Sequence, residues 1–234
     1  MSAEPLVAGA LHRAALYRML ATAFSYPTPA RLEALALGVR QAAAETCAAL
    51  RGALGRLADT AGHADVGTLA AEHVALFQRE VRCPPYEGAY GPAQMAGKAA
   101  LLADVAGFYR AFGLGPAAGQ PEVEDHVCAE LEFMSVLALK EAWALAGGQT
   151  EGLEVTRAAQ RAFLTDHLGR WSESFAGRLT AAAAPGLYPA AAALLRAWIE
   201  ADCARLGIAP RPLEGVQEAE AGTFTCPLAR PAPA

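Results

Sequence analysis

The sequence predicts an all-α protein that folds as a single domain, and three observations lead to this prediction. Apolar residues recur at helical spacing along most of the 234 residues. Alanine supplies much of a composition that is 54% hydrophobic, and it has the highest helix propensity of the amino acids. We find no internal repeat and no segment with the sustained alternation of a strand. A chain of this length can bury one large core, so we expect a single-domain helical bundle.

Proline and glycine divide the chain into successive helical segments. The first helix should end at Tyr26-Pro27, because a residue before proline is disfavoured in the α region. Residues 62–67 and 113–120 read as breaks, and 82–92 cannot be helical because Pro84 and Pro85 are consecutive. The predicted helices cover residues 6–24, 31–57 (as one helix or two), 68–80, 93–112, 121–146, 153–183 and 189–206.

The helix over residues 121–146 has the clearest local signals. Pro121 is tolerated at a first helical position, where its missing N–H would have no partner in any case. Acidic residues within 122–125 would face the positive end of the helix dipole, and Gly147-Gly148 would close the helix. We therefore expect this helix to begin at Pro121 and to run through the core.

Charge and hydropathy exclude several classes of protein. The net charge is −5 with no basic run, so the electrostatic footprint of a nucleic-acid binder is missing. The longest uncharged run, 179–195, is interrupted by Pro185 and Pro189, so we expect no membrane insertion. The first residues lack the features of a signal peptide, which favours a cytoplasmic protein.

The five cysteines form no Cys-x-x-Cys pair, so we expect free and mostly buried thiols, no metal and no cofactor. Residues 1–207 should form the helical domain. Residues 208–234 are rich in proline, alanine, glycine and glutamate, so we expect a flexible tail. A monomer is the default expectation, with a helix-swapped dimer as the alternative.

Asp125, His126 and Glu130 form the first cluster of chemically capable side chains, since His126 and Glu130 are one helical turn apart. Metal binding is disfavoured because no Glu-x-x-His or His-Glu-x-x-His pair is present. Acid–base catalysis by Asp125 and His126 is chemically conceivable, but no nucleophile motif or phosphate loop accompanies them. The alternative is a purely structural role for both residues. Asp125 would then interact favourably with the helix dipole, and His126 would pack or form a hydrogen bond at the helix start.

A second cluster combines Phe77 with Tyr86, Glu87 and Tyr90 in the proline-stiffened loop. Aromatic side chains on a stiff loop suit peptide binding, because they offer large contact area at low entropic cost. An ordinary loop with tyrosines packed onto the helices is the equally open alternative. In a third cluster, we interpret five side chains as a packing stripe and expect Asp166 and His167 to be partly exposed; the stripe is Phe163, Leu164, Leu168, Trp171 and Phe175.

Together and in this order, these segments resemble the TorD/DmsD/NarJ family of redox-enzyme maturation chaperones. Residues 125–134 are similar to a D-H-x-x-x-E-L-x-F-M signature, and residues 84–90 to a P-P-Y-E-x-x-Y segment. Residues 17–27 resemble the end of the family's first helix, and 163–171 resemble an F-L-x-x-H-L-x-x-W segment. The loop resembles most closely that of chaperones for dimethyl-sulfide dehydrogenase, ethylbenzene dehydrogenase or selenate reductase-type enzymes. Many family members carry tryptophan where this loop has tyrosine.

The resemblance implies a TorD-like all-α domain that is a chaperone and not an enzyme. Its partner would be the twin-arginine signal peptide, or the apo form, of the catalytic subunit of a molybdopterin oxidoreductase. Binding would assist cofactor insertion and delay export until the subunit has folded. The residues implied to line a peptide groove are Phe77, Tyr86, Glu87, Tyr90, Asp125, His126 and Glu130.

Two alternatives remain at this point. One is a NarJ-like assembly chaperone for a membrane-associated nitrate reductase. The other, from a different class, is a small helical enzyme that uses Asp125 and His126. The residues alone do not identify the client.

Overall fold

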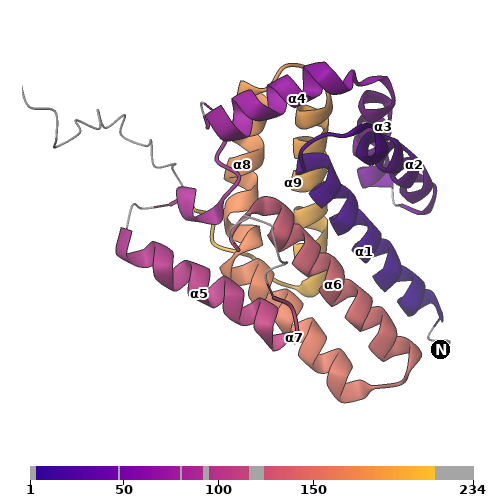
Figure 1. The fold of residues 1–234 in the computed structure, drawn as a ribbon. Coiled ribbons are helices and arrows are strands. Elements are labelled where there is room, and N and C mark those ends of the chain that lie inside the picture. The colour runs from indigo at the N-terminus through magenta and orange to yellow at the C-terminus, as the bar shows by residue number, and fades with distance from the viewer. Residues whose placement is uncertain (1–3, 47, 80, 92–94, 116–123, 214–234) are drawn as a thin grey trace, which may run out of the picture.

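The computed structural model describes residues 4–46, 48–79, 81–91, 95–115 and 124–213. Within these ranges the chain forms helices and no strand, which confirms the predicted all-α class (Figure 1). The elements are α1 (Glu4–Phe24), α2 (Pro29–Glu45), α3 (Ala48–His63), α4 (Val66–Val74), the π-helix η1 (Ala75–Arg79), the 3-10 helix η2 (Glu87–Ala89), α5 (Met95–Ala111), α6 (Val127–Ala146), α7 (Thr150–Asp166), α8 (Leu168–Ala182) and α9 (Leu187–Leu206).

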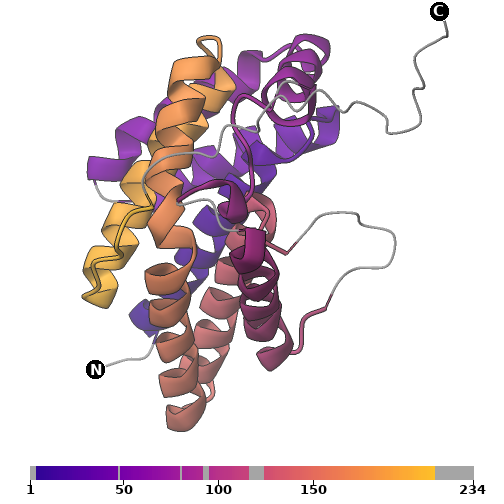
Figure 2. The ribbon, with the colours of Figure 1, turned by 90° about the vertical axis from the view of Figure 1, so that its left-hand side faces the viewer.

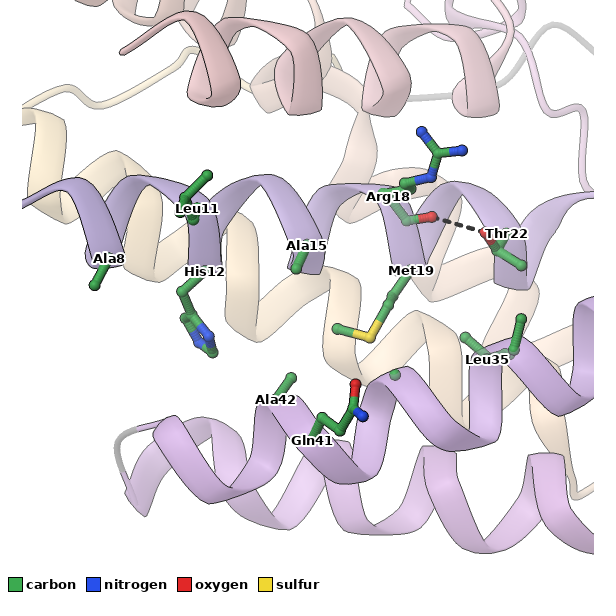
Figure 3. Close-up of a pocket in the computed structure, with 12 residues that line it drawn as sticks. Ala8, Leu11, His12, Ala15, Arg18, Met19, Thr22, Leu35, Gln41 and Ala42 are labelled. Atoms are coloured by element: carbon green, nitrogen blue, oxygen red, sulfur yellow. Dashed lines mark hydrogen bonds between the residues drawn. The ribbon is translucent and has the colours of Figure 1, made fainter. Parts of the chain in front are cut away.

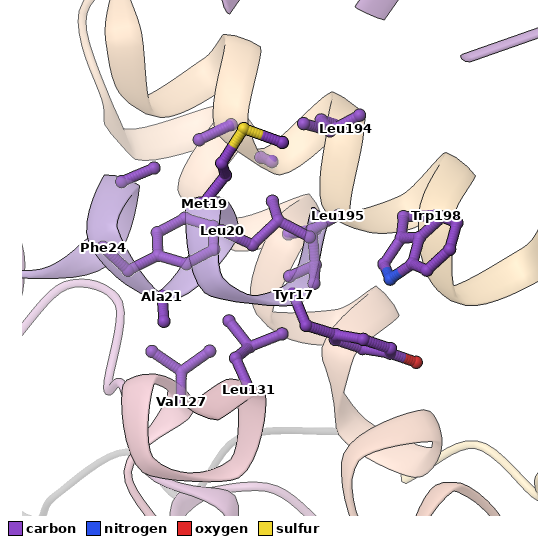
Figure 4. Packing of buried hydrophobic residues seen from close by; sticks show 14 of the residues in the cluster. Tyr17, Met19, Leu20, Ala21, Phe24, Val127, Leu131, Leu194, Leu195 and Trp198 are labelled. Carbon is purple, nitrogen blue, oxygen red and sulfur yellow. The ribbon is translucent and has the colours of Figure 1, made fainter. Parts of the chain in front are cut away.

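Helix α1 lies at the centre of the core. It runs beside α6 on one side and against α9 on another (Figure 1). Leu20 and Phe24 of α1 point among residues of both neighbours, such as Leu131 of α6 and Leu195 of α9 (Figure 4). Tyr17 is fully buried there, where its hydroxyl donates to Asp202 at 2.7 Å. Buried apolar residues of the helix predicted over residues 6–24 thus pack against α6 and α9 in the core.

A buried carboxylate joins α6 to α1 and α7. Glu141 accepts hydrogen bonds from Arg13, from Arg157 at 2.9 Å and from Gln160 at 2.8 Å. Burial alone would raise the pKa of Glu141, but the Gln160 hydrogen bond and the two guanidinium groups together hold that pKa below its usual range. Glu141 therefore stays ionised and bridges three helices.

Helix α5 covers one side of α6 and α7 and faces the viewer in Figure 2. Its aromatic residues lie on rings of the two helices beneath, with Phe108 5.3 Å from Phe163 and Tyr109 4.9 Å from Phe133 between ring centroids. These edge and tilted contacts attach α5 to the bundle close to the start of α6.

The helix predicted over 121–146 begins later than its local signals indicate. Glu124 and Asp125 form a turn, His126 is the N-cap with extended backbone, and α6 starts at Val127. The reason is a tertiary one: His126 pairs as an isolated antiparallel bridge with Tyr86 of the preceding loop. The expectation that Asp125 serves a helix starting at Pro121 was wrong. Pro121 and Glu122 lie outside the described residues.

The helix predicted over 153–183 is two helices, α7 and α8, which meet at His167. His167 has φ −126° and ψ −105°, values that end α7. Gly169 makes the junction possible, because a Cβ at this position would lie 2.3 Å from the carbonyl oxygen of Leu164 and 2.7 Å from Pro210. Only glycine permits so close a contact between backbone segments.

The first residues of the predicted tail, 208–213, run along α8. The Leu213 amide donates to the Arg170 carbonyl at 2.7 Å, and the Ser174 hydroxyl donates to the Leu213 carbonyl at 2.8 Å. Residues 214–234 lie outside the described part of the chain, so for them the expectation of a flexible tail stays a prediction.

Three of the five cysteines fall within the described ranges. Cys83 and Cys203 are buried free thiols, and burial raises the pKa of each to about 11. Cys128 is buried as well, and its Sγ donates to the Ala21 carbonyl at 3.3 Å. Cys47 and Cys226 lie outside the described residues. Among the described helices, none has the length and hydrophobicity needed to cross a lipid bilayer.

Candidate functional site

The loop of residues 81–91 crosses the start of α6 and joins the first two predicted clusters. The antiparallel Tyr86–His126 bridge holds it through two backbone hydrogen bonds, Glu87 N to Asp125 O at 2.9 Å and Val127 N to Pro85 O at 2.8 Å. Pro84 and Pro85 keep this stretch extended, as the sequence predicts. We call this place, where the loop meets the start of α6, the loop–helix site.

Glu87 turns inward from the loop. Glu87 is only 1% exposed, and its carboxylate accepts a hydrogen bond from His167 Nδ1 at 3.0 Å. Because a carboxylate only accepts, His167 carries its proton on Nδ1 in this contact. His167 Nε2 lies 3.5 Å from the exposed carboxylate of Asp104 on α5. Residues far apart in sequence therefore converge on one buried polar cluster.

Glu130, one turn into α6, is the second buried carboxyl group of this cluster. Its Oε2 accepts from the Trp171 indole N–H at 3.0 Å. Complete burial, and then the negative charge of Glu87, raise the pKa of Glu130 well above its ordinary value. The protonated form of Glu130 is therefore favoured next to Glu87.

Asp125 is fully buried too, and its Oδ2 accepts from the Gly88 amide at 3.0 Å. Burial raises the pKa of Asp125, while the Gly88 N–H opposes that shift. Asp125 thus fastens the loop to α6 through its side chain and through its own carbonyl group.

His126 and Tyr86 form the half-exposed edge of the loop–helix site. Their rings lie 5.1 Å apart between centroids in an edge-on arrangement. His126 Nδ1 accepts from the Cys128 amide at 3.1 Å, and burial lowers the pKa of His126 to about 4. The predicted hydrogen bond of His126 at the helix start is therefore confirmed, and the imidazole is neutral at physiological pH.

Phe77 and Tyr90 lie beneath the loop–helix site as parts of the aromatic core. Phe77 contacts Tyr188, with 5.5 Å between ring centroids, and Tyr90 lies 5.3 Å from Trp171. The Tyr90 hydroxyl donates to the Pro84 carbonyl at 2.9 Å, which secures the loop from below. Of the seven residues implied to line a groove, five are buried here, and only Tyr86 and His126 are partly exposed.

His167 is the residue of this site that the sequence reasoning missed. We expected partial exposure, which was wrong, since His167 is 2% exposed and bound to Glu87. The signal was present in the resemblance to an F-L-x-x-H segment, but a helical stripe alone does not show that this helix breaks at the histidine. The five-residue packing stripe from Phe163 to Phe175 is fully buried, as predicted.

Three buried polar atoms of the loop–helix site have no hydrogen-bond partner among the described residues. They are Asp125 Oδ1, Glu130 Oε1 and His167 Nε2. Buried polar atoms are nearly always paired in folded proteins, so three such atoms within one cluster are unusual. Two of them are carboxyl oxygens, which can accept hydrogen bonds from an incoming donor.

A family model described as the nitrate reductase delta subunit matches residues 34–177 of this chain, which is more than half of its length. The chain belongs to this family. The matched range contains the loop–helix site and the α7–α8 junction. Membership confirms the resemblance to the TorD/DmsD/NarJ group of redox-enzyme maturation chaperones and the TorD-like all-α fold.

Individual relatives are named as chaperones. A selenate reductase assembly chaperone protein of Thauera selenatis is 33% identical over 143 residues, 60% of this chain and 71% of that protein. A perchlorate reductase assembly chaperone protein of Dechloromonas aromatica (strain RCB) is 41% identical over 88 residues, 37% of each chain. The chaperone protein TorD of Vibrio cholerae serotype O1 is 38% identical over 81 residues, 35% of this chain and 36% of TorD.

The alignments with the last two relatives thus cover well under half of their lengths. All three relatives are named as chaperones and none as an enzyme, which confirms the expected class. The geometry of the loop–helix site agrees with this class, because the Asp125 and His126 side chains both bond backbone amides rather than each other.

Proposed function

We propose that this protein is a cytoplasmic assembly chaperone that acts as a monomer on the catalytic subunit of a molybdopterin oxidoreductase. It binds the subunit's twin-arginine signal peptide, its apo form, or both, assists cofactor insertion and delays export until the subunit has folded. Family membership supports the class of function, and the names of the relatives support a reductase as the client.

The observation that carries this proposal is the buried carboxyl group of Asp125, whose Oδ1 has no hydrogen-bond partner among the described residues. A guanidinium group has five N–H donors in a planar fork and pairs bidentately with carboxylates. An arginine that reaches this cluster supplies donors to Asp125 and a positive charge beside Glu87. The acidic loop–helix site and the twin-arginine motif are therefore complementary in charge and in hydrogen bonding.

The remaining residues of the site suit the apolar stretch that follows the arginines in such a peptide. Tyr86 and His126 offer a partly exposed aromatic edge, and Phe77 and Tyr90 extend this aromatic surface beneath the loop. Because five of the seven residues are buried, direct contact with all of them requires the loop of residues 81–91 to lift. We propose that this loop lifts when the peptide binds.

A second candidate is an assembly chaperone for a membrane-associated nitrate reductase, which the description of the family model favours. A client of this kind offers an N-terminal segment without a functional twin-arginine pair. The two candidates differ in their dependence on the two arginines, so one titration separates them.

The test is calorimetric titration of the full chain with a synthetic leader peptide of the candidate client and with a copy in which both arginines are lysine. We expect the arginine peptide to bind and the lysine peptide to bind about ten-fold more weakly, because lysine cannot form the bidentate pair. Equal binding of the two peptides would favour the nitrate reductase candidate. Absence of binding by both would refute the proposal.

Asp125→Asn tests the assignment of the site, because it keeps the side-chain shape and removes the charge. We expect about ten-fold weaker binding. Asp166→Asn is the matched control: Asp166 also precedes a histidine, but it is exposed and lies outside the cluster. Binding of Asp125→Asn as tight as that of the Asp166→Asn control contradicts the assignment.

A further inference from the structure

A second concave surface lies between α1 and α2, and none of the residues of the loop–helix site lines it (Figure 3). It is a groove with a volume of about 520 Å³. Small residues form much of its lining, namely Ala8, Ala15, Ala34, Gly38 and Ala42. Such residues allow another backbone to approach closely, because no long side chain holds it away.

The walls of the groove determine the conformation of what can bind in it. Both walls are α-helices, whose backbone N–H and C=O groups are already paired within α1 and α2. An extended segment would leave its own backbone groups without partners on this surface, whereas a helix satisfies them internally. The lining runs from Ala8 to Thr22 along α1, about 21 Å at the rise of an α-helix. This length matches about four turns of a docked helix.

Large apolar side chains extend the surface beyond the groove. Leu11, which lines the groove on α1, is 47% exposed, and beyond the groove Leu139 and Trp143 on α6 are 46% and 67% exposed. The two helices run antiparallel side by side, with the Ser135 hydroxyl bonded to the Ala14 carbonyl at 2.9 Å. In this register Leu139, one turn beyond Ser135, lies beside the turn of α1 that carries Leu11. Exposed apolar residues that gather in this way mark interaction surfaces.

One charged side chain, that of Arg18, gives the groove a positive charge. Arg18 is an exposed residue of α1 at the rim of the groove, and its guanidinium group points away from α2 (Figure 3). Within the described residues, no carboxylate accepts a hydrogen bond from its guanidinium group. The other polar residues of the lining, such as Gln41 and Thr22, are uncharged. A partner with an acidic side chain at this position is therefore favoured by charge complementarity.

We propose that the α1–α2 groove docks an amphipathic α-helix of a partner protein, with the apolar face of that helix on Ala15 and Gly38 and an acidic side chain beside Arg18. This helix-binding surface is additional to the loop–helix site and does not depend on the function proposed for that site. Leu139 and Trp143 contact the flank of the docked helix, which accounts for their exposure in the chain alone.

The test uses two fluorescein-labelled, alanine-rich peptides of about 16 residues, long enough to form helix. Both carry leucines along one face; one has glutamate at each end of that face, and the other has lysine. Fluorescence anisotropy with the full chain should show tighter binding of the glutamate peptide. Arg18→Glu should weaken the glutamate peptide about five-fold and strengthen the lysine peptide, because the sign of the pairing is reversed.

A variant that fills the groove tests its location. A Cβ on Gly38 would lie 3.2 Å from Met19 Sδ, the end of a flexible side chain, so Gly38→Leu should fold while occupying the groove. We expect it to weaken the glutamate peptide at least ten-fold. Gly62→Leu is the matched control on an exposed position of α3, where a Cβ meets nothing within 4 Å.

Three results would overturn the proposal. The first is equal binding of the two peptides by the native chain, and the second is binding unaffected by Gly38→Leu. The third is a native chain that is dimeric by light scattering and becomes monomeric in Gly38→Leu, because a second copy would then be the occupant.

Discussion

Glu130→Gln probes the protonation that the buried cluster imposes. In the folded protein, burial and the charge of Glu87 raise the pKa of Glu130 well above 4.5, its value in an ordinary environment. The unfolded chain releases the Glu130 proton near that ordinary value, whereas the folded chain retains it. The contribution of Glu130 to the free energy of unfolding is therefore fully present below about pH 4.5. It is lost as the pH rises toward the raised folded pKa of Glu130. Glutamine stays neutral and can still accept the Trp171 N–H, so the variant lacks this loss.

The size of the effect follows from linkage. Each pH unit between the two pKa values costs the native protein about 1.4 kcal/mol relative to the variant. As the pH rises above about 5.5, the free energy of unfolding of Glu130→Gln should therefore gain steadily on that of the native protein, until the pH reaches the raised folded pKa of Glu130. Urea denaturation followed by circular dichroism at several pH values measures both, and the difference at each pH removes the contribution of all other groups. A difference that stays constant with pH would refute the protonated state of Glu130.

Three further substitutions test the fold. Glu141→Gln should lower the free energy of unfolding by about 3 kcal/mol at neutral pH, because the buried Arg13 loses its charged partner. The folded pKa of Glu141 is depressed, so this loss of stability should become smaller as the pH falls below about 4.5. Urea denaturation at several pH values measures the loss, and a loss that does not change with pH would contradict the ionised state of Glu141. Gly169→Ala should cost about 3 kcal/mol in thermal denaturation because its Cβ meets the Leu164 carbonyl, whereas the unobstructed Gly177→Ala should be neutral or stabilising. A tolerated Gly169→Ala would mean that α7 and α8 do not meet as described. Tyr17→Phe removes the hydroxyl bonded to Asp202 and should cost about 1 kcal/mol in urea denaturation, while an unchanged midpoint would show that this bond contributes nothing.

The sequence predicted those parts of the fold that local physics decides. Apolar periodicity and helix-breaking residues located the helices, including the end of α1 before Pro27. Two of the boundaries that were wrong have one common reason, namely long-range contacts that no local pattern records. His126 takes an extended backbone because it pairs with Tyr86, which lies forty residues earlier in the chain. His167 leaves the helix because it bonds Glu87 across eighty residues.

The composition of the site was predicted better than its exposure. The resemblance brought the Tyr86–Tyr90 loop and the Asp125–Glu130 segment together, and the structure joins them through backbone hydrogen bonds. It did not reveal that the acidic side chains are buried. Burial of a carboxyl group depends on partners such as the Trp171 indole and the Gly88 amide, which a linear motif does not specify.

Burial of these acids leads to a prediction about how a leader peptide reaches them. Lifting residues 85–88 of the loop breaks their two backbone bonds to Asp125 and Val127, the Gly88–Asp125 side-chain bond and the Glu87–His167 bond. At about 1 kcal/mol each, the opening costs about 4 kcal/mol, so about one molecule in a thousand is open at equilibrium. The apparent affinity for the peptide is then lower than the affinity of the open form by the same factor.

Weakening the closed loop should therefore tighten peptide binding. Gly88→Ala places a Cβ 3.0 Å from Asp125 Oδ2 and 3.4 Å from a methyl group of Leu101, so it should destabilise the closed loop by about 1 kcal/mol. Faster hydrogen exchange of the Glu87 and Val127 amides would verify that weakening. Calorimetry with the same leader peptide should then give about five-fold tighter binding, because less free energy is spent on opening. If exchange is faster but the affinity is unchanged or weaker, the peptide binds to the closed edge of Tyr86 and His126, and the buried acids position the loop instead of contacting the peptide.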